Sequence, residues 1–179
     1  MLSNAKIDQP TKIRNYAILM LLSVYGMRCS EVKLLCLENI DWDNELIQLK
    51  RAKSSRPQTF PLTKTVGDAI LKYLKQVRAN NSKLREIFLC MRAPYRPLSN
   101  GTIYQIVSSN LKPLAPYIKH YGPHALRHAC ATHLINEGVL LKEISDHLGH
   151  QGLETTRIYS KVDLTNLRKV AEMNWGDLL

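Results

Sequence analysis

The chain has 179 residues, of which 45% are hydrophobic, so it is long enough to bury a core and fold as a domain. Its 25 lysines and arginines outnumber its 15 aspartates and glutamates, and the net charge of +10 favours an anionic partner. The four cysteines lack C-x-x-C spacing, and the densest apolar run, residues 16–25, is too short to span a bilayer. These features favour a cytoplasmic protein with reduced thiols and no membrane partner.

The first predicted element is a helix over residues 13–25, which is apolar on nearly every side and therefore belongs in the middle of the domain. Gly26 ends it, and Ser30 is expected to cap a second helix with Glu31 in its first turn. Arg28 lies in the turn between the two helices. An arginine enclosed by core helices is costly unless it is paired or functional. Arg28 therefore pairs with Glu31, serves a site, or does both.

Three short strands are expected over residues 39–42, 45–51 and 58–62, and they predict a small antiparallel sheet. The end of the second strand and the connection after it carry four cations: Lys50, Arg51, Lys53 and Arg56. A basic hairpin of this kind can contact the phosphates of a DNA backbone.

Helical periodicity returns over residues 63–78 and 99–111, the second with a serine at its capping position. Between these helices, residues 91–98 contain Arg92, Arg96 and two prolines. This composition predicts an exposed basic loop, and we expect its two arginines to bind DNA.

The C-terminal third contains polar side chains suited to a phosphodiester. A helix over residues 123–136 opens with a proline and presents His124 and Arg127 on one face, because they are three positions apart. The rest of this helix, with Cys130 and His133, is expected to pack inward.

A second helix over residues 141–148 ends at a glycine, which His150 follows, and Tyr159 comes nine positions later. A guanidinium, two imidazoles and a phenol provide donors for phosphate oxygens, proton carriers and a hydroxyl nucleophile.

The motifs H-A-L-R-H at residues 124–128 and L-G-H at residues 148–150, followed by that tyrosine, resemble the C-terminal catalytic box of the tyrosine recombinases, the phage integrase family. Y-G-M-R-C-S-E-V at residues 25–32 is similar to the first arginine motif of the family. The resemblance implies the catalytic-domain fold of a tyrosine recombinase, mainly α with a small three-stranded antiparallel sheet (α+β).

The resemblance also implies a role for each polar residue at the scissile phosphate. Arg28 and Arg127 would bind its two non-bridging oxygens and stabilise the charge of the transition state. Glu31 would orient the first of these arginines. His150 would add a third donor.

Tyr159 would be the nucleophile, His124 would take its proton, and Lys53 would protonate the departing 5′ oxygen. The family's commoner glycines beside this lysine are replaced here by alanine and serine. Neighbouring cations compete for the role or bind DNA: Lys50, Arg51 and Arg56.

No metal or other cofactor is expected. The histidines of the C-terminal third do not form an H-E-x-x-H motif, and no cysteines cluster near them, so a zinc site is not expected. The sequence also has no P-loop, so a nucleotide is not expected. His128 and His133 are interpreted as structural or backbone-contacting residues.

We expect one catalytic domain over residues 1–179, without the N-terminal core-binding domain usual in the family. The implied function is site-specific DNA recombination or integration through a 3′-phosphotyrosyl intermediate, with double-stranded DNA as the partner. The C-terminal helix, residues 163–179, would mediate self-association on DNA. Two alternatives remain open: DNA relaxation like that of a type IB topoisomerase, and DNA binding without catalysis.

Overall fold

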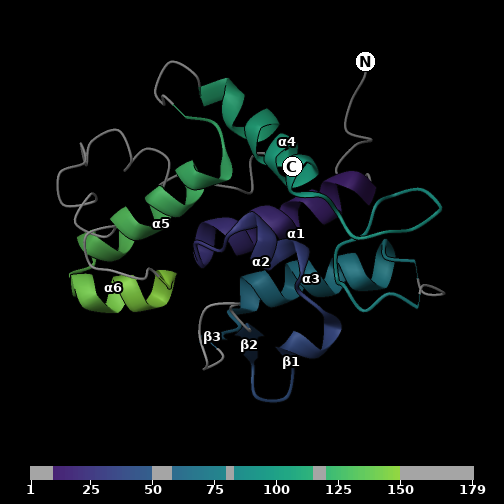
Figure 1. Ribbon diagram of the computed structural model, residues 1–179. Helices are drawn as coiled ribbons and strands as arrows, with labels where there is room; N and C mark the ends of the chain where they lie inside the picture. Colours follow the sequence, from purple (N-terminus) through teal and green to yellow (C-terminus); the bar gives the residue numbers. More distant parts are fainter. Residues whose placement is uncertain (1–9, 50–57, 80–82, 115–119, 150–179) are drawn as a thin grey trace, which may run out of the picture.

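The computed structural model describes residues 10–49, 58–79, 83–114 and 120–149 of the chain. Within these ranges the protein is mainly helical, with a three-stranded antiparallel sheet, as the sequence predicts (Figure 1). The elements in chain order are α1 (Pro10–Val24), α2 (Cys29–Lys33), the 3-10 helix η1 (Leu37–Asn39), β1 (Ile40–Asp41), β2 (Leu46–Leu49), β3 (Gln58–Pro61), α3 (Lys64–Gln76), α4 (Asn100–Leu111), the 3-10 helix η2 (Lys112–Leu114), α5 (Pro123–Asn136) and α6 (Leu141–Leu148).

Helix α1 is the centre of the domain. It packs against α2, α3, α4 and α5, and Figure 1 shows it in the middle of the molecule. The helix begins three residues before its predicted start, at Pro10, because proline is well suited to a first helical turn. Its buried residues cover nearly every side: Ile13, Arg14, Ala17, Ile18, Leu19, Met20, Leu21 and Leu22. The prediction of a central apolar helix is confirmed.

The turn after α1 requires a glycine. Gly26 has a φ of 60°, which is the left-handed region that side chains rarely adopt. A Cβ atom at this position would also lie 2.7 Å from a methyl carbon of Leu148 in α6. Any other residue at position 26 would have a strained backbone and would collide with Leu148, so the glycine allows α1 and α6 to approach each other here.

Helix α2 begins one residue before the predicted cap, so the assignment of the cap to Ser30 is wrong. Arg28 is the capping residue, with an extended backbone (φ −80°, ψ 153°). Its backbone N–H donates to the carboxylate of Glu31 at 2.8 Å. The glutamate three residues after the cap thus accepts a hydrogen bond from the backbone N–H of the capping residue, as in a capping box.

The sheet has the order β1-β2-β3, and both strand pairs are antiparallel. Ile47 and Phe60 are directly opposite each other in the register and are buried. The first strand is shorter than predicted, because residue 39 lies in η1 and residue 42 in the turn before β2, and β3 ends one residue before its predicted end. The predicted end of the second strand, residues 50–51, lies outside the described ranges. The hydroxyl of Tyr25 donates to the carbonyl of Pro61 at 2.7 Å and ties the sheet to the end of α1.

Helices α3 and α4 agree closely with their predicted ranges. The hydroxyl of Ser99 accepts a hydrogen bond from the backbone N–H of Thr102 at 3.0 Å, which confirms the predicted cap of α4. Leu89 and Pro97 form an isolated β-bridge, so the chain between α3 and α4 folds back on itself.

Helices α5 and α6 lie side by side at one end of the molecule (Figure 1). Cys130 is buried as expected, but His133 is exposed, so its predicted inward position is wrong. Towards its C-terminal end, α5 buries Ala131 against Ile144 and Leu148 of α6. Helix α6 thus covers a side of α5 other than the one that carries His133, so His133 faces solvent. None of the helices in the described ranges is long and apolar enough to cross a membrane.

Candidate active site

Arg28 forms the first part of the candidate site. Its guanidinium makes a 2.9 Å ion pair with Glu31, which confirms the predicted pairing. The same guanidinium donates to the backbone carbonyl of Gly149 at 2.9 Å. The side chain of Arg28 remains 39% exposed, whereas that of Glu31 is 10% exposed. Glu31 is therefore the buried member of the pair, and the side chain of Arg28 is partly exposed to solvent.

Arg127 lies on α5 and is only 5% exposed. Its guanidinium donates to the backbone carbonyl of Gly26 and to that of Leu148. These bonds join the turn before α2 to the end of α6. A buried guanidinium is acceptable here because backbone oxygens receive its donors.

The two arginines meet at the C-terminal end of α6. Arg127 binds the carbonyl of Leu148, and Arg28 binds that of the next residue, Gly149. Two positive charges at this position are favourable, because the C-terminus of a helix carries a partial negative charge. The fold thus brings the first arginine motif, the H-x-x-R motif and the L-G of the L-G-H motif to one place.

His124 lies in the first turn of α5 and is exposed. His128, one turn further along the helix, is half-buried. Burial lowers the pKa of His128 below its usual value, and electrostatic interaction with the neighbouring His124, His120 and Arg127 lowers it further. This environment favours the neutral form of the His128 ring.

Several predicted site residues lie outside the described ranges, and their roles remain predictions: Lys50, Arg51, Lys53, Arg56, His150 and Tyr159.

Arg92 and Arg96 lie on a short basic loop and are both exposed, as predicted. Cys90 holds the base of this loop. Its backbone N–H donates to the carbonyl of Arg96 at 2.9 Å, and its thiol donates to the carbonyl of Arg92 at 3.1 Å. The two guanidiniums are thus presented on an ordered backbone.

One side chain at this site was missed by sequence reasoning. The amide of Gln58, the first residue of β3, donates to the carbonyls of Asp146 and His147 in α6. Nothing in the sequence pattern distinguishes this glutamine from other polar strand residues. The contact depends on which elements pack together.

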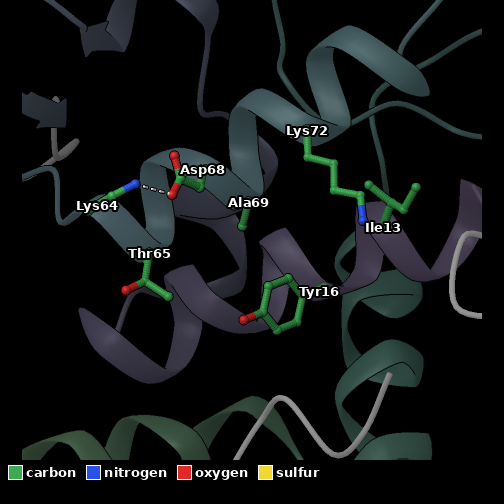
Figure 2. A pocket seen from close by; sticks show the side chains of 7 residues that line it. All are labelled: Ile13, Tyr16, Lys64, Thr65, Asp68, Ala69 and Lys72. Atoms are coloured by element: carbon green, nitrogen blue, oxygen red, sulfur yellow. Dashed lines mark hydrogen bonds and ion pairs between the residues drawn. The ribbon is translucent and has the colours of Figure 1, made fainter.

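A cavity of about 330 Å³ lies elsewhere, between α1 and α3 (Figure 2). It is lined by Ile13, Tyr16, Lys64, Thr65, Asp68, Ala69 and Lys72. An ion pair of 2.9 Å joins Lys64 and Asp68 at its rim. No residue predicted to be catalytic lines this cavity. Within the described ranges, no three histidine, cysteine, aspartate or glutamate residues are grouped so that they could hold a metal ion.

Comparison with known proteins identifies relatives over most of the chain. The family model described as Phage integrase family matches residues 1–165. A provisionally named integrase/recombinase of Sinorhizobium fredii, y4gC, is 38% identical over 173 residues, which are 96% of this chain and 88% of that protein. Tyrosine recombinase XerA of Thermococcus kodakarensis is 33% identical over 171 residues, which are 91% of this chain and 56% of that protein.

A solved structure has the same fold. It is the XerH site-specific recombinase bound to its difH substrate before cleavage, with a TM-score of 0.75 and 22% sequence identity. The match covers 94% of this chain and 47% of that one. The chain thus spans about half the length of XerA and XerH.

The fold, a helical domain with a small sheet, is that of a tyrosine recombinase catalytic domain, from a class of enzymes that break and rejoin DNA. The chain belongs to the phage integrase family. Site-specific DNA recombination is accordingly the function that its family indicates.

Proposed function

We propose that this chain cleaves and rejoins double-stranded DNA through a 3′-phosphotyrosyl intermediate, with its own Tyr159 as nucleophile. The observation that carries the proposal is the meeting of Arg28 and Arg127 at the end of α6, directly before His150. Two arginines fixed beside each other suit the two non-bridging oxygens of a phosphate, because the guanidinium matches the geometry of these oxygens.

In the proposed reaction, Arg28 and Arg127 stabilise the negative charge of the pentacoordinate transition state. Glu31 holds Arg28 in position through the 2.9 Å ion pair. His150 adds a third donor to the phosphate. Arg28 is the more accessible of the two arginines, so it is the first to meet the DNA backbone.

The remaining roles concern protons. Tyrosine has a pKa near 10 in water and is a poor nucleophile at neutral pH, so it needs a base and an activated phosphate. His124, exposed at the start of α5, is the proposed base. Lys53 is the proposed acid for the departing 5′ oxygen. The phosphotyrosyl bond conserves the energy of the phosphodiester, so a 5′-hydroxyl can reverse the step.

The test is incubation with a nicked suicide substrate followed by a denaturing gel. The chain should form a covalent adduct, and Tyr159→Phe should abolish the adduct while DNA binding persists. Tyr104→Phe is a matched control, because Tyr104 is a tyrosine exposed on α4. An adduct that persists in Tyr159→Phe would place the nucleophile elsewhere.

The two alternative functions are less favoured, because relatives over nearly the whole chain are named integrases or recombinases. A topoisomerase-like enzyme would remove supercoils without joining strands in new combinations. A binding protein without catalysis would form no adduct. Both outcomes are read in the same assay with two distinguishable nicked substrates.

We further propose that the protein acts in the cytoplasm and assembles on DNA through residues 163–179, which lie outside the described ranges. The Tn1549 transposon integrase, which has a similar fold with a TM-score of 0.68, is solved in complex with transposon right end DNA, and this supports a DNA partner for this chain. Truncation after Asp163 should leave the domain folded and abolish cooperative binding in gel-shift titrations. Unfolding of the truncated chain would show that this segment belongs to the core.

A further inference from the structure

Four consecutive backbone carbonyls at the end of α6 accept hydrogen bonds from side chains of other elements. They belong to Asp146, His147, Leu148 and Gly149. The last turn of an α-helix leaves its carbonyls without donors from the helix itself. In α6 the backbone N–H of Gly149 supplies one such donor, to the carbonyl of Asp146, and side chains of other elements supply donors to all four carbonyls. These outside donors therefore restrain the orientation of the last turn of α6.

Two of the three donor side chains are the arginines of the proposed site, Arg28 and Arg127. The third is Gln58, whose amide nitrogen donates to Asp146 at 3.2 Å and to His147 at 2.5 Å. Gln58 pairs with Leu49 in the sheet, so it connects the β2–β3 pair directly to α6.

Apolar contacts hold α6 on the domain without this glutamine. Ile144 and Leu148 are fully buried, and the ring of His147 meets Phe60 edge-on at 5.1 Å. Such contacts are not directional, so they fix where the helix lies but not how its last turn is oriented. Hydrogen bonds are directional, so Gln58 restrains the orientation of this turn.

We propose that Gln58 is a positioning residue that orients His150 through the last turn of α6. His150 follows Gly149 directly in the sequence. This inference rests on the proposed function, in which His150 donates to the scissile phosphate. Gln58 acts only through the backbone of α6 and takes no part in proton transfer.

The test compares two substitutions of Gln58 with the same changes at Gln48. Gln58→Ala removes the donor. Gln58→Glu keeps the shape but places an acceptor and a negative charge at the negative end of α6. Gln48 is a matched control, because it is a glutamine exposed on the adjacent strand β2.

Single-turnover cleavage of a nicked substrate should fall by about tenfold in Gln58→Ala and further in Gln58→Glu, since tenfold corresponds to about 1.4 kcal/mol, the net size of one hydrogen bond. The dissociation constant for DNA should stay within about twofold of the wild-type value. Both Gln48 variants should cleave like the wild type. Thermal unfolding of each variant confirms that the domain is folded.

The decisive measurement is a double-mutant cycle with His150→Ala. If Gln58 acts through His150, Gln58→Ala should cause no further loss of cleavage in that background. A second tenfold loss there, or wild-type cleavage by both Gln58 variants, overturns the inference while leaving the proposed function intact. If the wild-type chain forms no adduct, the proposed function fails and the inference fails with it.

Discussion

Arg28 donates a 2.9 Å hydrogen bond to the backbone carbonyl of Gly149, which lies 121 positions further along the chain. Arg127 makes the equivalent contact to Leu148 and also reaches back to the carbonyl of Gly26. The turn after α1, the helix α5 and the end of α6 are thus joined by two side chains. The positions of both arginines are therefore coupled to the packing of α6.

Glu31→Gln should lower the single-turnover cleavage rate by about tenfold, because a charged support of Arg28 becomes neutral. The control is Asp68→Asn, which breaks an ion pair of the same 2.9 Å length on the exposed surface of α3. That variant should cleave at the wild-type rate, since exposed ion pairs contribute little. Equal rates for Glu31→Gln and the wild type would show that the ion pair does not orient Arg28.

Arg28→Ala and Arg127→Ala should each reduce cleavage by on the order of 10²-fold, as the loss of a transition-state donor does. Their effects on stability should differ. Arg127→Ala removes a buried donor from the backbone carbonyls of Gly26 and Leu148 and should lower the free energy of unfolding by about 3 kcal/mol. Arg28→Ala should cost less than about 1 kcal/mol, because the side chain is partly exposed. Urea denaturation measures both, and equal losses would contradict the assigned environments.

Arg92→Ala and Arg96→Ala should weaken DNA binding and each reduce the slope of log K against log salt by about one unit, because each guanidinium is exposed on an ordered loop. Cleavage at saturating DNA should be unchanged. Lys64→Ala, which removes an exposed cation from α3, serves as the comparison. A salt slope that is the same in all three variants and the wild type would remove these arginines from the DNA interface.

Acidification should destabilise the protein through His128. Its pKa in the folded state lies below the usual value of 6.5, mainly because the ring is buried. Below that pH the unfolded chain binds a proton more readily than the folded chain, so stability falls as the pH decreases. When the pH is lowered from about 7.5 to about 5.5, the free energy of unfolding measured by denaturation should fall less in His128→Gln than in the wild type. His133→Gln, at an exposed position on the same helix, should behave like the wild type.

Thr132→Val should preserve or raise stability. Thr132 is 1% exposed, and its hydroxyl has no hydrogen-bond partner among the described residues. Valine has the same shape without the polar atom, so the substitution removes a desolvation cost of about 1 kcal/mol. Thermal unfolding checks the sign, and a clear loss of stability would mean that the hydroxyl is satisfied.

Local patterns were sufficient to predict most elements. The apolar run of α1, the serine before α4 and the glycine after α6 each act within a few residues, so their effects can be read from the sequence. The cap of α2 was misassigned because a serine is the usual capping residue, whereas here Glu31 satisfies the backbone of Arg28. His133 was misplaced because the side of α5 that is buried depends on α6.

The sequence by itself determined the fold class and the family, since ordered motifs and helical periodicity are properties of the chain. It also predicted the pair Arg28–Glu31, whose members are three positions apart. Only the tertiary structure decided that Arg127 is buried and that Gln58 reaches the end of α6. The physical reason is that these bonds end on backbone carbonyls, which every residue possesses, so no side-chain pattern in the sequence marks the acceptor.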